Sequence, residues 1–408
     1  MVGALLLAAA PAASAADRDQ RTTTAPVSTT TVRVAPALAA YTPTTADTRM
    51  AKALTSRATT TRFGTSFSGA VIDAASNATV WSKSGTTGKM PASTNKLVTA
   101  SNALTLFGPD KRWTTQVRQG AYSTRVVLVG SGDPSLRSSS LDAMARTTAT
   151  MLLGKSITQA RVYVDDDIFP TPSLAYGWKS SYVPDSIAPV RALVRDQRNN
   201  SDTSAEAGRY FRDRLKAYGV SAAGYYGRAD AASGSAVIAS SNGSTLSTII
   251  QTMLLNSDNE IAETLHKQVG RALGHGATWT AARTAQADEL AVQKLTSGAL
   301  YDGSGLSRAD RLSAVQLARI VDRGVDPATQ AKLWPLKSGL PTAGRTGTLA
   351  SRFNTTASKC AVGKVWAKTG TLGDVAASMS MFCFTVVEEV LPLTTNAKVL
   401  TRPSAPVV

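Results

Sequence analysis

The sequence predicts an α/β (α+β) fold with a subdomain inserted into a larger domain. Three observations lead to this prediction. Short strand-like runs pair around turns both early and late in the chain, segments with helical spacing lie between them, and a long mixed block separates the two halves. The chain has 408 residues, of which 43% are hydrophobic, so it can bury at least one large core.

Local patterns predict the individual elements. Residues 67–72 and 78–82 flank a short turn and predict a hairpin of two strands. Apolar residues with helical spacing at 97–104 predict a helix that stops at Gly108 and has Ser93 at its start. The same reasoning predicts strands at 125–130 and 160–164, helices at 204–218, at 246–255 and from 260 onward, and two final strands around a turn at 372–373.

Composition predicts how the chain is divided. Residues 1–15 contain an apolar run followed by Ala13-Ser14-Ala15, a pattern typical of a secretory signal peptide. Residues 16–50 are dominated by Thr, Ala and Pro and predict a disordered linker. The mixed block between the two halves of the rest of the chain indicates an insertion. We expect one main domain at 51–115 and 241–408, with an inserted subdomain at 116–240.

The two cysteines, Cys360 and Cys383, are compatible with an oxidising compartment outside the cell. If the last two strands turn at 372–373, these cysteines lie nearly opposite each other, and we expect them to form a disulfide. Their spacing does not match a zinc motif, and the two histidines of the chain do not cluster with them. We therefore expect neither a metal nor another cofactor.

The net charge is +16, from 44 basic and 28 acidic residues, and such a charge attracts polyanions. The sequence contains no zinc-finger, basic-zipper or aromatic-rich RNA-binding motif, so we do not expect nucleic acid as a partner. For an exported protein, anionic cell-wall polymers are the expected polyanion, and the alternative is a generally solvated basic surface. No apolar run is long enough to cross a bilayer, so we expect no transmembrane segment.

The first chemical motif indicates a serine nucleophile. With two histidines, a Ser-His-Asp triad has few ways to form, and the sequence has no G-x-S-x-G elbow. Ser93-Thr94-Asn95-Lys96 is the only S-x-x-K, and this spacing on a helix places Lys96 beside Ser93. Burial lowers the pKa of a lysine and lets it act as a base, while the helix N-terminus offers N–H groups to an oxyanion. In the alternative, Ser93 only caps the helix and Lys96 is solvated.

A second motif, Ser257-Asp258-Asn259, lies in the predicted break between two helices. There the hydroxyl of Ser257 and the amide of Asn259 can project into a cleft, although the motif can also be an ordinary helix cap. Ser240-Ser241-Asn242 also matches S-x-N, but no helix precedes it.

A third motif is Lys368-Thr369-Gly370, which has rivals in Lys83-Ser84-Gly85, Lys337-Ser338-Gly339 and Arg345-Thr346-Gly347. Among them Lys368 alone lies in a strand-like run, where it can attract a carboxylate while Gly370 lets a substrate approach the strand edge. In the alternative, Lys368 is a solvated edge lysine before a turn glycine. The three motifs follow the order S-x-x-K, S-D-N, K-T-G of penicillin-recognising enzymes.

Between about residues 69 and 380, the chain resembles the type-4 low-molecular-mass penicillin-binding proteins, the D-Ala-D-Ala carboxypeptidase/endopeptidase family. The resemblance rests on MPASTNKLVTA, GSGDPSL, APVRALVRDQRNN, TMLLNSDNEIAETL, YDGSGLSRADRLSA, LPTAGRTGTL and VWAKTGTLGDV. It implies a serine β-lactamase/transpeptidase-like catalytic domain, with an antiparallel sheet flanked by helices. It also implies cofactor-free hydrolysis of peptidoglycan stem peptides, sensitivity to β-lactam antibiotics, and a place outside the cytoplasm, extracellular or associated with the cell wall.

The resemblance further implies roles for single residues. Ser93 is the acylated nucleophile, Lys96 is its base, and Ser257 and Asn259 relay a proton and hold the substrate amide. Lys368 and Thr369 bind the terminal carboxylate of the substrate, which approaches the strand edge at Gly370. The backbone N–H groups of Ser93 and Thr371 form the oxyanion hole.

Two features depart from the family pattern. Members that bind a diaminopimelate side chain have an acidic residue and a tyrosine soon after the tryptophan equivalent to Trp178, whereas this chain offers Ser181 and Ser186. The segment after about residue 385 has no helical periodicity, although relatives end with further strands and a helix. The specificity for the third residue of the stem peptide is therefore not predicted. Two other functions of the same fold also stay open: a serine β-lactamase or esterase, and a catalytically inactive wall-binding homologue.

Overall fold

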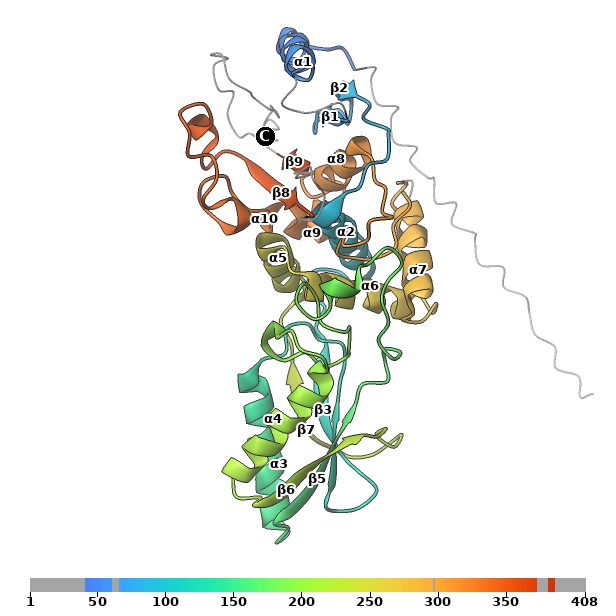
Figure 1. The fold of residues 1–408 in the computed structure, drawn as a ribbon, viewed down its shortest axis with the longest axis vertical. Helices are drawn as coiled ribbons and strands as arrows, with labels where there is room; N and C mark the ends of the chain where they lie inside the picture. Colours follow the sequence, from blue (N-terminus) through green and yellow to red (C-terminus); the bar gives the residue numbers. More distant parts are fainter. Residues whose placement is uncertain (1–40, 61–65, 296–297, 373–380, 386–408) are drawn as a thin grey trace, which may run out of the picture. The chain divides into compact units, whose positions relative to one another are not determined.

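The structure, a computed structural model, describes residues 41–60, 66–295, 298–372 and 381–385 (Figure 1). It begins with helix α1 (Thr45–Arg57), which has a capping box: the Thr44 hydroxyl accepts the N–H of Asp47, and the Asp47 carboxylate accepts the N–H of Thr44. The linker predicted for 16–50 is therefore wrong at its end, because this capping signal was masked by the Thr/Ala/Pro composition. The predicted signal peptide lies outside the described residues.

Two antiparallel strand pairs form separate two-stranded sheets, one near each end of the described residues. The predicted N-terminal hairpin is confirmed as β1 (Gly69–Ile72) and β2 (Thr79–Lys83), with an irregular register between Val71 and Ile72. The second pair is β8 (Trp366–Gly370) and β9 (Met381–Thr385). Helix α8 (Ala314–Asp322) contacts both β1 and β9, so these pairs share one helical neighbour.

The register of the second pair differs from the prediction. Lys368 lies opposite Cys383, because the chain between Gly370 and Met381 is much longer than the tight turn expected at 372–373. Cys360 lies outside the strand, in the short 3-10 helix η6 (Lys359–Ala361), and its thiol is free and exposed. The predicted opposition of the two cysteines, and the disulfide derived from it, are therefore wrong.

A five-stranded mixed sheet is formed by the residues between the first and second chemical motifs. The strand order is β6-β5-β4-β3-β7, in which β3 is antiparallel to β4 and β7, while β4, β5 and β6 run parallel. The strands are β3 (Thr114–Gln119), β4 (Arg125–Val129), β5 (Gln159–Asp165), β6 (Ala222–Arg228) and β7 (Val237–Asn242).

Helices α3 (Ser138–Gly154) and α4 (Thr203–Ala217) pack against this sheet and against each other (Figure 1). The sheet and its helices enclose their own core, which includes Leu128, Val162 and Phe211, each with no exposed side-chain surface. From Tyr41 onward the described residues nevertheless form one compact unit. The division into a catalytic domain and an insertion stays a prediction.

The other large core is helical and surrounds α2 (Lys96–Phe107), in which every residue from Lys96 to Leu104 is buried. The helices that contribute to this core or border it are α5 (Leu246–Asn256), α6 (Asn259–Ala272), α7 (Trp279–Val292), α8, α9 (Gln330–Leu333) and α10 (Pro335–Ser338). A helix buried on all sides cannot shift without disrupting its neighbours. The residues at the N-terminus of α2 are therefore held in a fixed position.

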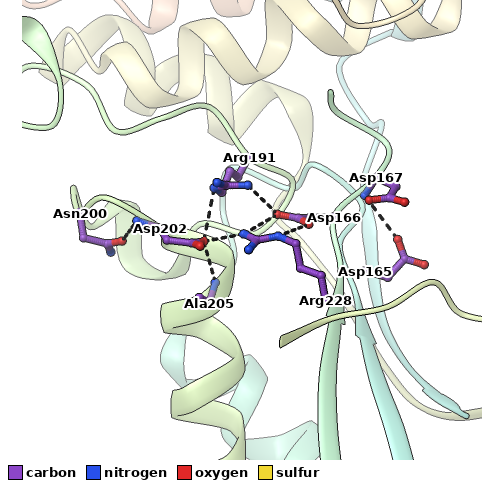
Figure 2. Close-up of polar contacts among 8 residues, drawn as sticks. All are labelled: Asp165, Asp166, Asp167, Arg191, Asn200, Asp202, Ala205 and Arg228. Carbon is purple, nitrogen blue, oxygen red and sulfur yellow. Dashed lines mark hydrogen bonds and ion pairs between the residues drawn. The ribbon is translucent and has the colours of Figure 1, made fainter. Parts of the chain in front are cut away.

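A long connection, residues 166–202, leads from β5 to α4, and we call it the connecting loop. Asp166 at its start and Arg191 and Asp202 towards its end form ion pairs with one another and with Arg228 at the end of β6 (Figure 2). Arg228 contacts Asp166 at 2.9 Å and Asp202 at 2.6 Å, and Arg191 contacts both carboxylates at 3.3 Å. These four residues, the ionic clasp, tie both ends of the connecting loop to the five-stranded sheet.

Candidate active site

Ser93 lies in the 3-10 helix η2 (Ala92–Asn95), which runs directly into α2. Lys96, the first residue of α2, has no exposed surface, and its Nζ lies 3.1 Å from Ser93 Oγ. The contact predicted from the S-x-x-K spacing therefore exists. Two further oxygens lie close to the same nitrogen: Asn259 Oδ1 at 2.7 Å and the carbonyl oxygen of Ser304 at 2.9 Å.

These contacts suit a neutral amine. Burial lowers the pKa of Lys96 to about 8, against the opposing effect of nearby carboxylates. The oxygens of Asn259 and Ser304 can only accept, so they take the two hydrogens of a neutral amine. The remaining lone pair of Lys96 is then left for the hydroxyl of Ser93. This arrangement can withdraw the proton of Ser93.

The second motif forms the predicted break between α5 and α6. Ser257 ends α5 in the left-handed conformation, with φ of 60°, and Asp258 caps α6 by accepting the N–H of Ile261 at 2.9 Å. Capping is therefore the task of Asp258, and the side chains on either side of it are available for other contacts. Asn259 donates from Nδ2 to the carbonyl oxygen of Ser186 at 2.8 Å, while its Oδ1 accepts from Lys96.

The third motif lies in β8, and its lysine contacts the second motif. Lys368 has no exposed surface, and its Nζ donates to Ser257 Oγ and to the carbonyl oxygen of Thr369, each at 2.8 Å. Burial lowers the pKa of Lys368 well below its usual range, and the positive charge of Lys96 adds to this effect. Lys368 and Ser257 can therefore share a proton. The hydroxyl of Thr369 donates to Thr348 Oγ1 at 3.0 Å.

Gly370 brings the edge of β8 against the turn that carries Ser93. A Cβ atom at this position would lie 2.7 Å from the carbonyl oxygen of Pro91 and 3.2 Å from the backbone nitrogen of Ser93. Glycine therefore allows the close approach of the two segments, a contact within the chain that the third motif did not predict. Thr371 follows directly and is exposed.

The rival motifs lie elsewhere. Lys83 donates to the carbonyl oxygen of Ala58 at 2.7 Å, and Lys337 lies in α10 with its Nζ 5.3 Å from the centre of the Trp366 ring. Arg345 is exposed, and Ser241 of the second S-x-N match pairs with Thr115 inside the five-stranded sheet. The structure thus brings together the side chains of Ser93, Lys96, Ser257, Asn259 and Lys368, as the motif order predicts.

Several contributors to the site were missed in the sequence. The backbone carbonyls of Ser186 and Ser304 bind Asn259 and Lys96, and no pattern of residue types reveals a backbone acceptor. Glu263 supports the backbone beside Ser304, and it follows Asn259 by four residues on α6. That spacing, which puts both side chains on one face of the helix, is a signal that could have identified Glu263.

The two serines that replace the diaminopimelate-binding pattern, Ser181 and Ser186, are both exposed. The tryptophan that precedes them, Trp178, donates from Nε1 to Asp302 Oδ2 at 2.7 Å. The connecting loop thus contacts the candidate site at two points, through Trp178 and through Ser186.

Comparisons with known proteins point to one family. A model of the family described as D-Ala-D-Ala carboxypeptidase 3 (S13) matches residues 50–200 and 182–382. Carboxypeptidase DacB of Mycolicibacterium smegmatis is 32% identical over 324 residues, an alignment that covers 74% of this chain and 70% of that protein.

The similar solved structures include penicillin binding protein 4 (dacB) of Haemophilus influenzae, with a TM-score of 0.63 at 18% identity, covering 75% of this chain and 84% of that one. The same protein in complex with a β-lactam gives a TM-score of 0.58 at 19% identity, with the same two coverages. At this identity the likeness concerns the fold, and it confirms the predicted α/β architecture with a sheet flanked by helices.

Proposed function

Because the chain belongs to the D-Ala-D-Ala carboxypeptidase 3 (S13) family, we propose that it hydrolyses peptidoglycan stem peptides with Ser93 as its nucleophile. Membership makes the chain a serine-type D-Ala-D-Ala carboxypeptidase, which is the enzyme class expected from the motifs. The observation that carries the assignment of Ser93 is its contact with the buried amine of Lys96, at 3.1 Å.

The first half of the reaction is acylation. The neutral amine of Lys96 takes the proton of Ser93, whose Oγ attacks the carbonyl carbon of the penultimate D-alanine. The backbone N–H groups of Ser93 and Thr371 stabilise the oxyanion. The C–N bond then breaks, and the proton that Lys96 took from Ser93 passes through Ser257 to the leaving amine, so that Lys96 is neutral again. Lys368, whose Nζ lies 2.8 Å from Ser257 Oγ, orients the hydroxyl of Ser257 for this transfer.

The second half is hydrolysis of the acyl-enzyme. A water molecule attacks the ester carbonyl and gives a proton to Lys96. Lys96 passes this proton to Ser93 Oγ as the ester C–O bond breaks, so that Ser93 leaves as the free hydroxyl and Lys96 is neutral again. Water and the peptide carbonyl supply every atom that the products need, so no cofactor takes part. The same sequence cleaves a D-Ala-D-Ala terminus as a carboxypeptidase or a D-amino-acid cross-link as an endopeptidase.

Substrate binding is assigned to the edge of β8. The extended peptide lies along Gly370 and Thr371, its amide contacts Asn259, and its terminal carboxylate lies near Thr369 and Lys368. The close approach of Gly370 to the backbone nitrogen of Ser93, 3.2 Å from a Cβ atom built there, supports this placement.

Incubation with a fluorescent penicillin and with a D-Ala-D-Ala peptide tests the proposal. We expect a stable adduct, mapped to Ser93 by mass spectrometry, together with release of D-alanine. Rapid turnover of the penicillin without peptide cleavage would instead indicate a β-lactamase on this fold. Absence of both labelling and cleavage would indicate an inactive wall-binding homologue.

We also propose that the chain is exported and acts at the cell wall, where its charge of +16 binds anionic polymers. The Ala13-Ser14-Ala15 pattern supports export, and in the described part of the chain no helix is long and apolar enough to cross a membrane. Fractionation of cells that express a tagged chain tests export. Co-sedimentation with purified walls should weaken as salt is added, and salt-independent binding would contradict the electrostatic origin.

A further inference from the structure

A buried carboxylate lies behind the candidate base. Glu263 has no exposed surface, and both of its oxygens accept from the backbone: Oε2 from the N–H of Gly303 at 2.9 Å and Oε1 from the N–H of Ser304 at 2.7 Å. The next N–H along the chain, that of Gly305, donates to Asp302 Oδ1 at 2.8 Å. Three successive backbone donors are therefore held by two carboxylates.

This segment is also confined from the other side. Gly305 has a φ of +81°, and a Cβ atom there would lie 1.9 Å from the carbonyl oxygen of Ala92, next to Ser93. The carbonyl of Ser304 is consequently fixed, and it accepts from Lys96 Nζ at 2.9 Å. A continuous chain of hydrogen bonds runs from Glu263 through Ser304 and Lys96 to Ser93.

We propose that Glu263 is a positioning residue for acyl transfer, which holds the Ser304 carbonyl against the amine of Lys96 and sets the charge state of that amine. The inference rests on the proposed role of Lys96 as the base. If the Ser304 carbonyl moves away, one N–H of the amine loses its acceptor and can turn towards Ser93, and the lone pair then no longer faces the hydroxyl.

The charged groups around the amine of Lys96 determine in which direction Glu263 shifts the pKa of that amine. The groups that act on Lys96 are Glu263 and Asp258 on α6, Asp302 on the loop before Ser304, and Lys368 on β8. Among the three carboxylates, Glu263 has the largest effect, and it raises the pKa of Lys96 against the effect of burial. Removing the negative charge of Glu263 therefore lowers the pKa of Lys96 further.

Glu263 itself is surrounded by groups of both signs. Burial raises the pKa of Glu263, and the neighbouring Asp302 adds to this effect. Both carboxylate oxygens nevertheless accept backbone N–H groups, from Gly303 and Ser304, and these hydrogen bonds favour the ionised form. Lys267 lies on the same helix; burial lowers its pKa to about 8, and Glu263 opposes this effect. Asp310, whose pKa burial raises to about 10, is neutral near pH 7 and adds no charge there.

The experiment measures the second-order rate of acylation by fluorescent penicillin as a function of pH. In Glu263→Gln we expect the acidic limb of the profile to move to lower pH and the plateau to fall by up to about 100-fold, the scale of a misplaced catalytic group. In Glu263→Asp the negative charge is kept, but the side chain is one methylene group shorter. We expect the limb to stay at its wild-type pH while the plateau falls.

Glu289→Gln is the matched control. Glu289 is a buried glutamate of α7. Burial raises its pKa, against the opposing effect of Arg323 and Lys332, and Lys96 directs its hydrogen bonds to Ser93, Asn259 and Ser304 instead. We expect its pH profile to match that of the wild type. The melting temperature of each variant separates a folding defect from a changed active site.

An acidic limb that does not move in Glu263→Gln, with a plateau equal to that of Glu289→Gln, would overturn the inference while leaving the proposed function intact. If Glu263→Gln does not fold, a wild-type plateau in Glu263→Asp would overturn it equally. A wild-type chain that takes no label at all would contradict the proposed function, and the role of Glu263 with it.

Discussion

The side-chain amide of Asn259 donates to the backbone carbonyl of Ser186 at 2.8 Å, while its oxygen accepts from Lys96 at 2.7 Å. One side chain therefore joins the candidate base to the connecting loop. Because that loop is tied to the five-stranded sheet by the ionic clasp, the sheet takes part in positioning the site. The expected effects of mutations follow from this connection and from the contacts of β8.

Ser93→Ala is expected to abolish both penicillin labelling and D-alanine release, because no other serine of the chain has a lysine three residues later. Labelling by fluorescent penicillin and peptide hydrolysis both measure this. Ser181→Ala, which removes an exposed hydroxyl of the connecting loop, is the control and should label normally. Residual labelling of Ser93→Ala would mean that another residue is the nucleophile.

Lys368→Ala is expected to lower kcat/KM on a D-Ala-D-Ala peptide by about 100-fold or more, the scale of losing a group that stabilises a transition-state charge. The reason is that Ser257 loses its hydrogen-bond donor and the strand edge loses its cation. Lys337→Ala, in α10, should stay near the wild-type value. The opposite ranking would mean that Lys337, and not Lys368, is the functional lysine.

Gly370→Ala is expected to lower kcat/KM by about 100-fold and stability by about 1–3 kcal/mol, because the new methyl group meets the carbonyl oxygen of Pro91 at 2.7 Å. Peptide kinetics and thermal unfolding measure the two effects. Gly154→Ala at the end of α3 is the control, since a Cβ atom there has nothing within 4 Å. Equal behaviour of the two variants would show that β8 and the Ser93 turn can separate freely.

The acylation rate of the wild-type enzyme is expected to rise with pH and to level off above about 8, the pKa of Lys96. Burial disfavours the ammonium form, and this form, which predominates below the pKa, cannot accept the proton of Ser93. Rates of labelling at a series of pH values measure this. A rate that is already constant well below pH 8 would indicate that Lys96 is not the titrating base.

Arg191→Ala is expected to lower the acylation rate by roughly 2- to 30-fold, which corresponds to about 0.5–2 kcal/mol of coupling through the connecting loop. Arg191 contacts Asp166 and Asp202, so its loss removes two of the four ion pairs of the clasp and weakens the hold on the connecting loop, and Arg191→Lys should recover part of the rate. Arg214→Ala, which breaks the ion pair with Asp142 between α4 and α3, is the control. A similar loss in both variants would point to general destabilisation of the sheet.

The contacts that could be predicted from the sequence are local or belong to an ordered motif. Ser93 and Lys96 lie three residues apart on one helix, so the geometry of the helix alone brings them together. The contact between Ser257 and Lys368 joins positions 111 residues apart. The motif order assigned both residues to one site, although no spacing rule predicts the contact itself.

What could not be predicted depends on backbone groups and on chain length. The Ser304 carbonyl contacts Lys96 through an atom that every residue has, so residue types give no hint of it. The register of β9 depends on how much chain lies between Gly370 and Met381, and periodicity within each strand does not fix that. Helix α1 was missed because its capping signal stood in a segment of linker-like composition.

The spacing between Asn259 and Glu263 at the start of α6 limits which insertions and deletions the chain tolerates. Asn259 and Glu263 are four residues apart, about 6 Å along the helix axis. Asn259 contacts Lys96 directly, and Glu263 holds the backbone of Ser304, whose carbonyl accepts from Lys96. Inserting or deleting one residue between them would rotate Glu263 by about 100° away from the backbone that it holds. This segment is therefore intolerant of any change in length, whereas the many surface connections of the chain can lengthen without disturbing the site.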